Sequence, residues 1–438
     1  MNPVQGTESA GTRVHHGYGV VVALMLVYAF NVVDRNIIVI LLEPIKHEMR
    51  LSDTQLGFLT GVVFAFFYSV MGIPMAMWAD RHNRRNLIIL TLVLFAGMTL
   101  WSGLAAGFLT LLCARMLMAV AQAGTSPAAH SMISDMFPPH RRAAALSTYL
   151  AGMNVGQLLL FLVGGWVSQV YGWRAAYLAA GIPALLLALV VGVVLKEPPR
   201  GQSEGLQAQA AGSTPPLGLV IAHLWAQRSF RHLIAAIAIG AIGSFSIVIW
   251  FPSFLRRSVG MSALEVGTAM ALYTGILGGT GTYLSGHIAD RLGRRDVRWN
   301  LWLAALTNAL VFPFCVAAYL AGSRLGTLAL FVFPSLAFTA NLAPSIAMTH
   351  GLATVRMRAQ ASALLFFTLT IVGQSVGPQL TGLISDHLAR HYGRDSLRYA
   401  LLIMSVFWLW SAVHFLLATR TLKDDLARVR QAAAMAAA

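Results

Sequence analysis

The stretch that decides the fold reads GIPMAMWADRHNRRN and runs from Gly72 to Asn86. It lies between two long apolar runs, so its charges are expected in a short loop at a membrane surface. The pattern returns later as GHIADRLGRR, from Gly286 to Arg295. Each copy separates the second and third apolar runs of its half, which predicts two halves of like topology. Two unrelated basic loops would obey the positive-inside rule, but nothing would make them share an aspartate at the same spacing.

Both copies place one aspartate and three arginines at matching positions. They are Asp80, Arg81, Arg84 and Arg85 in the first copy, and Asp290, Arg291, Arg294 and Arg295 in the second. In these residues the chain resembles the major facilitator superfamily, whose loop motif reads Gly-x-x-x-Asp-Arg-x-Gly-Arg-Arg. The second copy fits fully, whereas the first has Ala76 for the helix-packing glycine and Asn83 for the turn glycine. Asparagine tolerates left-handed backbone better than most residues, so the change at Asn83 is expected to be mild.

Composition places the chain among polytopic membrane proteins. Of its 438 residues, 57% are hydrophobic and 11% are charged, against roughly 25% charged residues in soluble proteins. The net charge of +15 does not indicate a nucleic-acid partner, because nearly all the charges lie in short loops between apolar runs. Cys113 and Cys315 both fall inside apolar runs, so no disulfide framework is implied.

A spanning helix needs about 20 apolar residues, and the sequence offers twelve candidates. The first is too long for the core of a signal peptide and is interpreted as a retained helix. The predicted spans are 18–44, 53–78, 86–107, 109–136, 142–170, 173–195, 230–255, 262–289, 298–320, 325–350, 358–387 and 397–419.

The basic residues predict the orientation of these spans. Segments on the same side as the N-terminus hold more than twice as many Lys and Arg residues as the opposite segments, which places both termini in the cytoplasm. The chain then divides into an N-terminal tail (1–17), a six-helix bundle (18–195), a linker (196–228), a second six-helix bundle (229–420) and a C-terminal tail (421–438). The linker is rich in Gly, Gln, Ser and Pro, which suits a flexible connection.

Two charged residues at membrane depth indicate a functional site, since a charge there is costly unless it is paired or hydrated. Asp34 lies roughly 15 Å below the outer end of the first span, and Arg115 roughly 9 Å inside the outer end of the fourth. An Asp34–Arg115 ion pair is therefore expected, either as part of a proton-coupling site or as a static structural pair. Gln122 lies on the same helix face as Arg115 and would continue the polar wall.

Other polar residues within the spans are candidates for contact with a substrate, although each would equally suit helix–helix hydrogen bonding. They are Asn31, Asn154, Gln157, Asn341 and Gln374.

The charged loops also predict a cytoplasmic gate. When the cavity opens outward, the two halves must close on the cytoplasmic side. Asp80 or Asp135 is then expected to pair with Arg84, Arg141 or Arg142, and Asp290 with Arg294 or Arg295. A single exposed pair contributes only about 0–1 kcal/mol, so a network is needed to hold a gate closed. The end of the tenth span has no counterpart of Asp135, which predicts the stronger lock in the N-terminal half.

A narrower resemblance covers about residues 28–195, where the chain is similar to the spinster group. The matching text includes Asp34-Arg35, Glu43–Lys46, Leu51–Gly57, Arg115, Ala123-Gly124 and Ser131–Pro139. The resemblance implies a proton-linked carrier of lipid-like amphiphiles, with Asp34 as the protonation site and Arg115 as its partner. The group usually has an acid where this chain has Gln122, which puts the coupling stoichiometry in doubt.

The sequence thus predicts an all-α fold of twelve transmembrane helices in the cytoplasmic membrane of a bacterium. The predicted function is proton-coupled transport of an amphiphilic anion by a monomer, with protons and membrane lipids as partners and without a cofactor or bound metal. The alternatives are a symporter for an aromatic or other organic acid, a multidrug exporter, and a non-transporting receptor or scaffold. An enzyme is disfavoured, because we find no nucleophile elbow, metal-ligand cluster or phosphate loop.

Overall fold

The computed structural model describes residues 5–199, 215–338 and 340–437, and these form helices without a strand. Nine of the described helices are long and apolar enough to cross a membrane. Two of them, Arg141–Val194 and Arg358–Gln431, each cover two predicted spans. The predicted span 262–289 is divided among three shorter elements. The all-helical prediction is confirmed, and the helices are consistent with twelve spans.

Contacts divide the chain into two compact units that differ from the predicted halves by an exchange of two segments. Residues 50–65 belong to the second unit, and residues 263–271 belong to the first. The first unit holds α1 (Gln5–Met49), α3 (Phe64–Arg81, from Phe66), α4 (Arg84–Gly103), α5 (Phe108–Gln122), α6 (Thr125–Met136), α7 (Pro139–Val194) and α10 (Ala263–Met270).

The second unit holds the remaining elements, of which η1, η3 and η5 are π-helical. They are α2 (Asp53–Gly57), η1 (Phe58–Val63), α8 (Leu217–Trp225), α9 (Arg228–Arg257), η3 (Ala271–Leu277), α11 (Gly278–Gly293), α12 (Trp299–Leu320), α13 (Arg324–Ala337), α14 (Leu342–Leu352), η4 (Val355–Met357), α15 (Arg358–Thr368), η5 (Leu369–Gln374), α16 (Ser375–Tyr392), η6 (Gly393–Asp395) and α17 (Ser396–Ala437).

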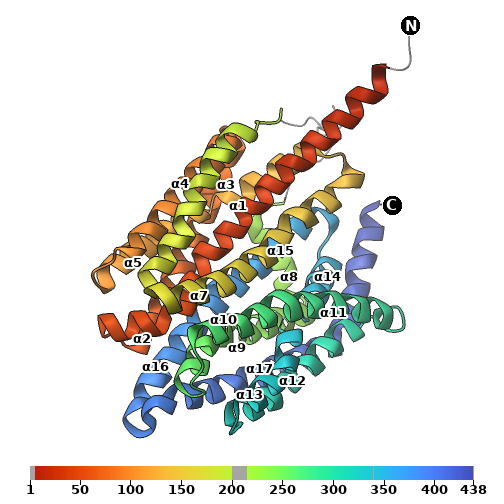
Figure 1. Ribbon diagram of the computed structural model, residues 1–438. Coiled ribbons are helices and arrows are strands. Elements are labelled where there is room, and N and C mark those ends of the chain that lie inside the picture. Colours follow the sequence, from red (N-terminus) through yellow and green to blue (C-terminus); the bar gives the residue numbers. More distant parts are fainter. Residues whose placement is uncertain (1–4, 200–214, 339, 438) are drawn as a thin grey trace. The chain divides into compact units, whose positions relative to one another are not determined.

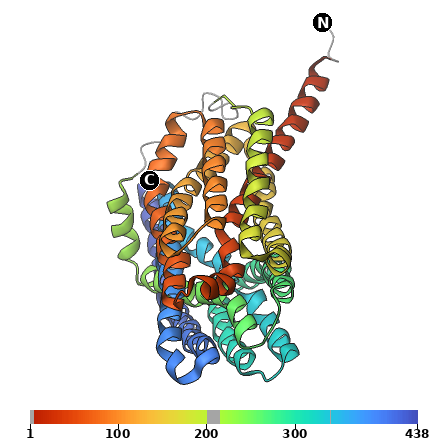
Figure 2. The ribbon, with the colours of Figure 1, turned by 60° about the vertical axis from the view of Figure 1, so that its left-hand side comes forward.

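In the first unit, α1 packs along α7 (Figure 1). A non-helical backbone at Gly172, with φ of 87°, kinks α7 at the predicted boundary between two spans. The orange α4 lies beside the yellow-green second half of α7 (Figure 2), where Gly103 and Gly181 allow close approach. Apolar side chains such as Leu24, Phe95 and Met132 fill the core between these helices.

In the second unit, α9 packs along α17 (Figure 1), and Phe230, Leu301 and Phe415 belong to its core. Large apolar side chains also cover outward faces of both units; Ile73 and Val193, for example, are 71% and 83% exposed. Such faces suit contact with lipid.

The end of the linker and the C-terminal tail form helix in the part of the chain that the structure describes. Residues 200–214 of the linker lie outside the described residues, but Leu217–Trp225 forms helix α8. The Gln227 side chain donates to the Leu352 carbonyl at 2.8 Å, which fastens the end of this segment to α14. The tail continues helix α17, because the buried Asp425 accepts from the backbone N–H and hydroxyl of Ser229.

The close packing of Gly57 in α2 against the backbone of α16 can be tested by its effect on protein stability. A Cβ at Gly57 would lie 2.5 Å from the Pro378 oxygen, so Gly57→Ala is expected to destabilise the protein by about 1–3 kcal/mol. Gly72 lies in the same continuous run of helix with nothing within 4 Å of a Cβ, so Gly72→Ala is the matched control. We expect only the Gly57 variant to lose apparent thermal stability in detergent, and equal midpoints would contradict the packing argument.

Candidate functional site

Asp34 lies fully buried in the middle of α1. Neither of its carboxylate oxygens has a hydrogen-bond partner among the residues that the structure describes. The hydroxyl of Thr99 on α4 interacts with it without reaching hydrogen-bond geometry. Tyr177 of α7, also buried, lies close enough to interact electrostatically with both Asp34 and Arg115.

Arg115 is buried on α5, but the expected ion pair with Asp34 is not formed in the described part of the chain. Its Nη1 instead donates to the Arg35 carbonyl at 2.7 Å and to the Met118 sulfur at 3.6 Å. A guanidinium carries five N–H donors in a planar fork. The Arg35 carbonyl of α1 accepts from one of the Arg115 nitrogens, and this contact holds Arg115 beside the chain neighbour of Asp34.

Gln122 joins this cluster from the last position of α5, just before the helix is interrupted at Ala123-Gly124. Its Nε2 donates to the Asn31 carbonyl at 3.2 Å, and its Oε1 accepts from Arg35 Nε at 3.4 Å. The Arg35 guanidinium also lies over the Tyr68 ring, 4.5 Å from its centroid.

The site therefore contains Asn31, Asp34, Arg115 and Gln122, as the sequence predicts, together with Arg35, which the sequence analysis did not select. The signal for Arg35 was present, because an arginine within an apolar run is as unusual as an aspartate. No sequence pattern pointed to Tyr68 or Tyr177, since aromatic side chains in spans most often pack.

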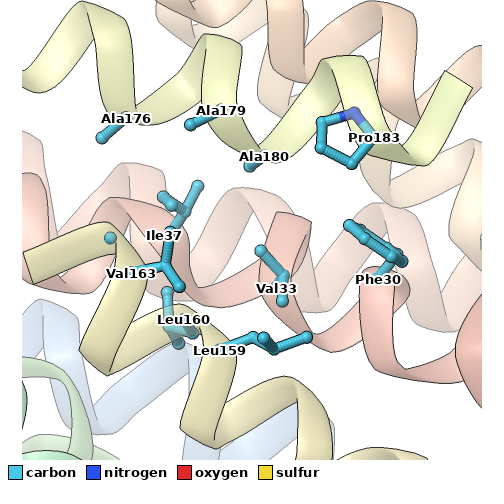
Figure 3. Close-up of a pocket in the computed structure, with 11 residues that line it drawn as sticks. Phe30, Val33, Ile37, Leu159, Leu160, Val163, Ala176, Ala179, Ala180 and Pro183 are labelled. Carbon is cyan, nitrogen blue, oxygen red and sulfur yellow. The ribbon is translucent and has the colours of Figure 1, made fainter. Parts of the chain in front are cut away.

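An apolar cavity of about 150 Å³ adjoins this segment of α1. Figure 3 shows Phe30, Val33 and Ile37 of α1 lining it together with residues of both halves of α7, including Leu159 and Ala180. Val33 is the chain neighbour of Asp34, but neighbouring side chains of a helix point to different faces, and Asp34 does not line this pocket. The pocket is open on one side, and its lining is mostly apolar, which suits apolar groups.

Of the remaining predicted substrate contacts, Asn154 and Gln157 belong to the first unit and Asn341 and Gln374 to the second. Asn154 is exposed and Gln157 is half-buried on α7. In the second unit, Asn341 Nδ2 donates to Asn308 Oδ1 at 3.3 Å, and Asn308 donates to Ser411 at 2.9 Å. Asn341 thus makes a helix–helix hydrogen bond, the alternative that the sequence left open. Gln374 is buried in the π-helical η5.

The first charged loop is organised around Arg84, whose side chain is only 1% exposed. Arg84 donates to Asp135, to Glu197 Oε1 at 2.8 Å, to Ser131 Oγ at 2.9 Å and to the Pro198 carbonyl at 2.9 Å. One arginine therefore joins the ends of α4, α6 and α7. The Arg84–Asp135 pair was among those predicted, whereas the role of Glu197 was not foreseen.

The neighbouring residues refine the reading of the loop motif. Asn83 has φ of −69° and caps α4 by accepting from the Asn86 N–H. The expectation based on left-handed backbone is thus wrong, and the substitution is mild because asparagine is a good N-cap. Arg85 donates to the carbonyls of Leu195 and Gly192 at the end of α7. Arg142 donates to the Phe137 carbonyl, while Asp80, Arg81 and Arg141 are exposed.

The second charged loop is organised around Asp296. Asp290, Arg291, Arg294 and Arg295 are exposed, and Asp290 forms no ion pair with Arg294 or Arg295 in the described structure. Asp296 gathers the cations instead, accepting from Arg298 Nη2 at 2.9 Å and from Lys423 Nζ of α17 at 2.8 Å. Arg298 and then Lys423 hold the pKa of the Asp296 carboxyl well below its usual range. In this conformation the turn directs Asp296, rather than Asp290, toward Arg298 and Lys423, and the pairing of Asp290 in the outward-open state stays a prediction.

Comparisons with known proteins agree with this arrangement. Residues 24–378 match the model of the Major Facilitator Superfamily. An MFS-type efflux pump of Mycolicibacterium smegmatis is 35% identical over 92% of each chain. A cis,cis-muconate transport protein of Acinetobacter baylyi is 26% identical over 63% of this chain and 66% of its own. The crystal structure of a bacterial homologue of the human lysosomal transporter spinster, inward-facing and unoccupied, is 28% identical over 94% of this chain and 98% of its own, with a TM-score of 0.85. These matches confirm the resemblance inferred from the sequence.

Proposed function

Because this chain belongs to the major facilitator superfamily and is an integral membrane transporter, we propose that it couples protons to the movement of an amphiphilic, anionic small molecule. The observation that carries the proposal is the buried Asp34 carboxyl, which lacks a hydrogen-bond partner in the described structure. An ionised carboxylate in such a place is stable only with a cationic partner. We infer that Asp34 carries a proton in this conformation and releases it when Arg115 turns toward it.

The charges around Asp34 support an anionic substrate. Arg35 and Arg115 bring two guanidinium groups to the cluster, while Gln122 adds an amide rather than a carboxylate. The planar forks of these guanidinium groups suit a carboxylate or phosphate of the substrate. The apolar pocket beside α1 would accept an apolar part of such a molecule.

Reconstitution into proteoliposomes tests this proposal directly. An imposed pH gradient should drive accumulation of an anionic amphiphile such as a lysolipid, and a protonophore should abolish it. Equal uptake with and without the gradient would contradict proton coupling.

Two alternatives rest on particular relatives. The similarity to an MFS-type efflux pump over nearly the whole chain favours export of hydrophobic compounds. The similarity to a muconate transport protein favours import of an organic acid. A hydrophobic cation and an aromatic carboxylic acid, assayed in the same vesicles in both directions, distinguish these functions from lipid-like transport.

The cytoplasmic network around Arg84 is proposed to favour one conformation of the transporter. Neutralising Asp80 together with Asp135 is expected to increase the inward-open population, because Asp135 is a direct partner of the buried Arg84. Asp290→Asn should have a smaller effect, since Asp290 is exposed and forms no ion pair in the described structure. Distances between spin labels on the cytoplasmic side would report both populations, and equal distributions in the double variant and the parent would mean that the charges only fix topology.

A further inference from the structure

Five residues near the outer end of the second predicted span form a charged network within the second unit, named here the outer lock. They are Asp53, Thr54, Arg257, Ser385 and Asp386. The first two belong to the N-terminal half of the sequence, and the other three to the C-terminal half. The network therefore fastens a segment of one repeat to helices of the other.

Asp53 is the centre of the outer lock and is only 1% exposed. Both of its oxygens accept from Arg257, Oδ2 from Nη1 and Oδ1 from Nη2, each at 2.6 Å. Oδ2 also accepts from Ser385 Oγ at 2.7 Å. A bidentate arginine–carboxylate pair with an additional hydroxyl donor is among the stronger polar contacts in proteins. Removing one partner leaves a buried charge uncompensated.

Asp386 makes the second half of the outer lock. Its carboxylate accepts from the backbone N–H of Asp53 at 3.0 Å and of Thr54 at 2.8 Å, and from Thr54 Oγ1 at 2.6 Å. These N–H groups belong to the first turn of a helix, where the backbone has no partner of its own and favours an anion. The contact is thus made in both directions: Asp53 of the segment 50–65 accepts from α16, and Asp386 of α16 accepts from that segment.

Two π-helical segments adjoin the outer lock. η1 follows α2 directly, and η5 precedes α16 directly. A Cβ at Gly61 in η1 would lie 2.7 Å from the Gln374 carbonyl of η5, so the two segments meet backbone to backbone. Such π-helical turns are rare, are frequent at functional sites and are places where helices bend. Both helices can therefore bend just inside the network.

The other exchanged segment also packs through glycines. Within the first unit, α10 packs against α7 at Gly267 and Gly165, where a Cβ on either glycine would meet backbone atoms of the other helix. The side-chain amide of Gln169 accepts from the Leu264 N–H at 2.8 Å. Close glycine contacts therefore occur in both exchanged segments, since Gly57 and Gly61 of the segment 50–65 also approach backbone atoms of α16 and η5.

We propose that Asp53 and Asp386 are positioning residues for transport, which hold the outer end of the second span on α9 and α16 and set the population of the outward-open state. The outer lock is closed in this conformation. Opening the transporter outward requires the segment 50–65 to leave Arg257, Ser385 and Asp386, with η1 and η5 bending as it does so. The proposal requires transport by this family but neither proton coupling nor a particular substrate.

Electron paramagnetic resonance distances test this proposal without substrate or a pH gradient. Nitroxide labels replace the exposed Phe58 and Tyr392 in a background in which Cys113 and Cys315 are alanine. The background should give one short distance. In Asp53→Asn and Asp386→Asn, the ratio of long to short distances should rise at least about tenfold, because a buried charge pair or its anchor has been broken.

Three further variants separate positioning from a loss of structure. Asp53→Glu keeps the charge and should restore most of the short distance. Ser385→Ala removes a single hydrogen bond and should give a smaller rise, which keeps the test open if Asp53→Asn does not fold. Asp395→Asn disrupts a more exposed ion pair with Arg398 in the same unit and should leave the distances unchanged. An unchanged distance distribution in Asp386→Asn and Ser385→Ala, or a rise in Asp395→Asn equal to theirs, would overturn the proposal.

Discussion

Asp34→Asn is expected to abolish accumulation of substrate driven by a pH gradient, while exchange of substrate across the membrane continues. An asparagine fills the same space but cannot bind and release a proton, so the coupled step is lost and the pathway is kept. Initial rates of gradient-driven uptake and of counterflow, measured in the same proteoliposomes, separate the two activities. Uptake should fall to the passive level.

The matched control is Asp395→Asn, which makes the same chemical change at a more exposed carboxylate. It should retain gradient-driven uptake. If Asp34→Asn also accumulates substrate as the parent protein does, Asp34 is not the coupling site, and its burial without a hydrogen-bond partner must have another explanation. If both uptake and counterflow are lost, its role is in forming the pathway rather than in coupling.

Arg115→Ala is expected to weaken binding of an anionic substrate by about 10–100-fold. Hydrogen bonds to charged groups contribute about 1.5–3 kcal/mol, and the variant also removes the support that Arg115 gives to the Arg35 carbonyl. Arg115→Lys keeps the charge but loses the planar fork, so its loss should be smaller. Equilibrium binding of a labelled anion to purified protein measures both variants, and a neutral analogue controls for general damage.

Variants of Arg35 and Gln122 test whether the positive charge of the cluster is what binds the anion. Arg35→Ala should weaken binding of the anion because it removes a positive charge. Gln122→Glu should weaken it as well, because it places a carboxylate 3.4 Å from Arg35 Nε, where the amide oxygen now lies. Unchanged affinity in both Arg115→Ala and Arg35→Ala would exclude anion recognition by this cluster and favour the exporter of hydrophobic compounds.

The sequence by itself determined the membrane fold, because a span is a local property. Some 20 apolar residues must form a helix in lipid, where every backbone polar group has to be satisfied internally. The repeated loop motif identified the family for a similar reason, since spacing within one loop can be read without knowledge of distant contacts. Asp34 and Arg115 were found because charges at membrane depth are costly wherever the chain places them.

Which charge meets which partner was decided only by the tertiary structure. Arg115 contacts the Arg35 carbonyl rather than the Asp34 carboxylate. Asp296 accepts from Arg298 and from Lys423 of α17. A long side chain reaches several acceptors from one backbone position, and the packing of neighbouring helices chooses among them. The outer lock is the clearest case: Asp53 and Asp386 are 333 residues apart, and no local pattern links them. They meet because glycines let two helices from different repeats approach closely, a choice made by packing alone.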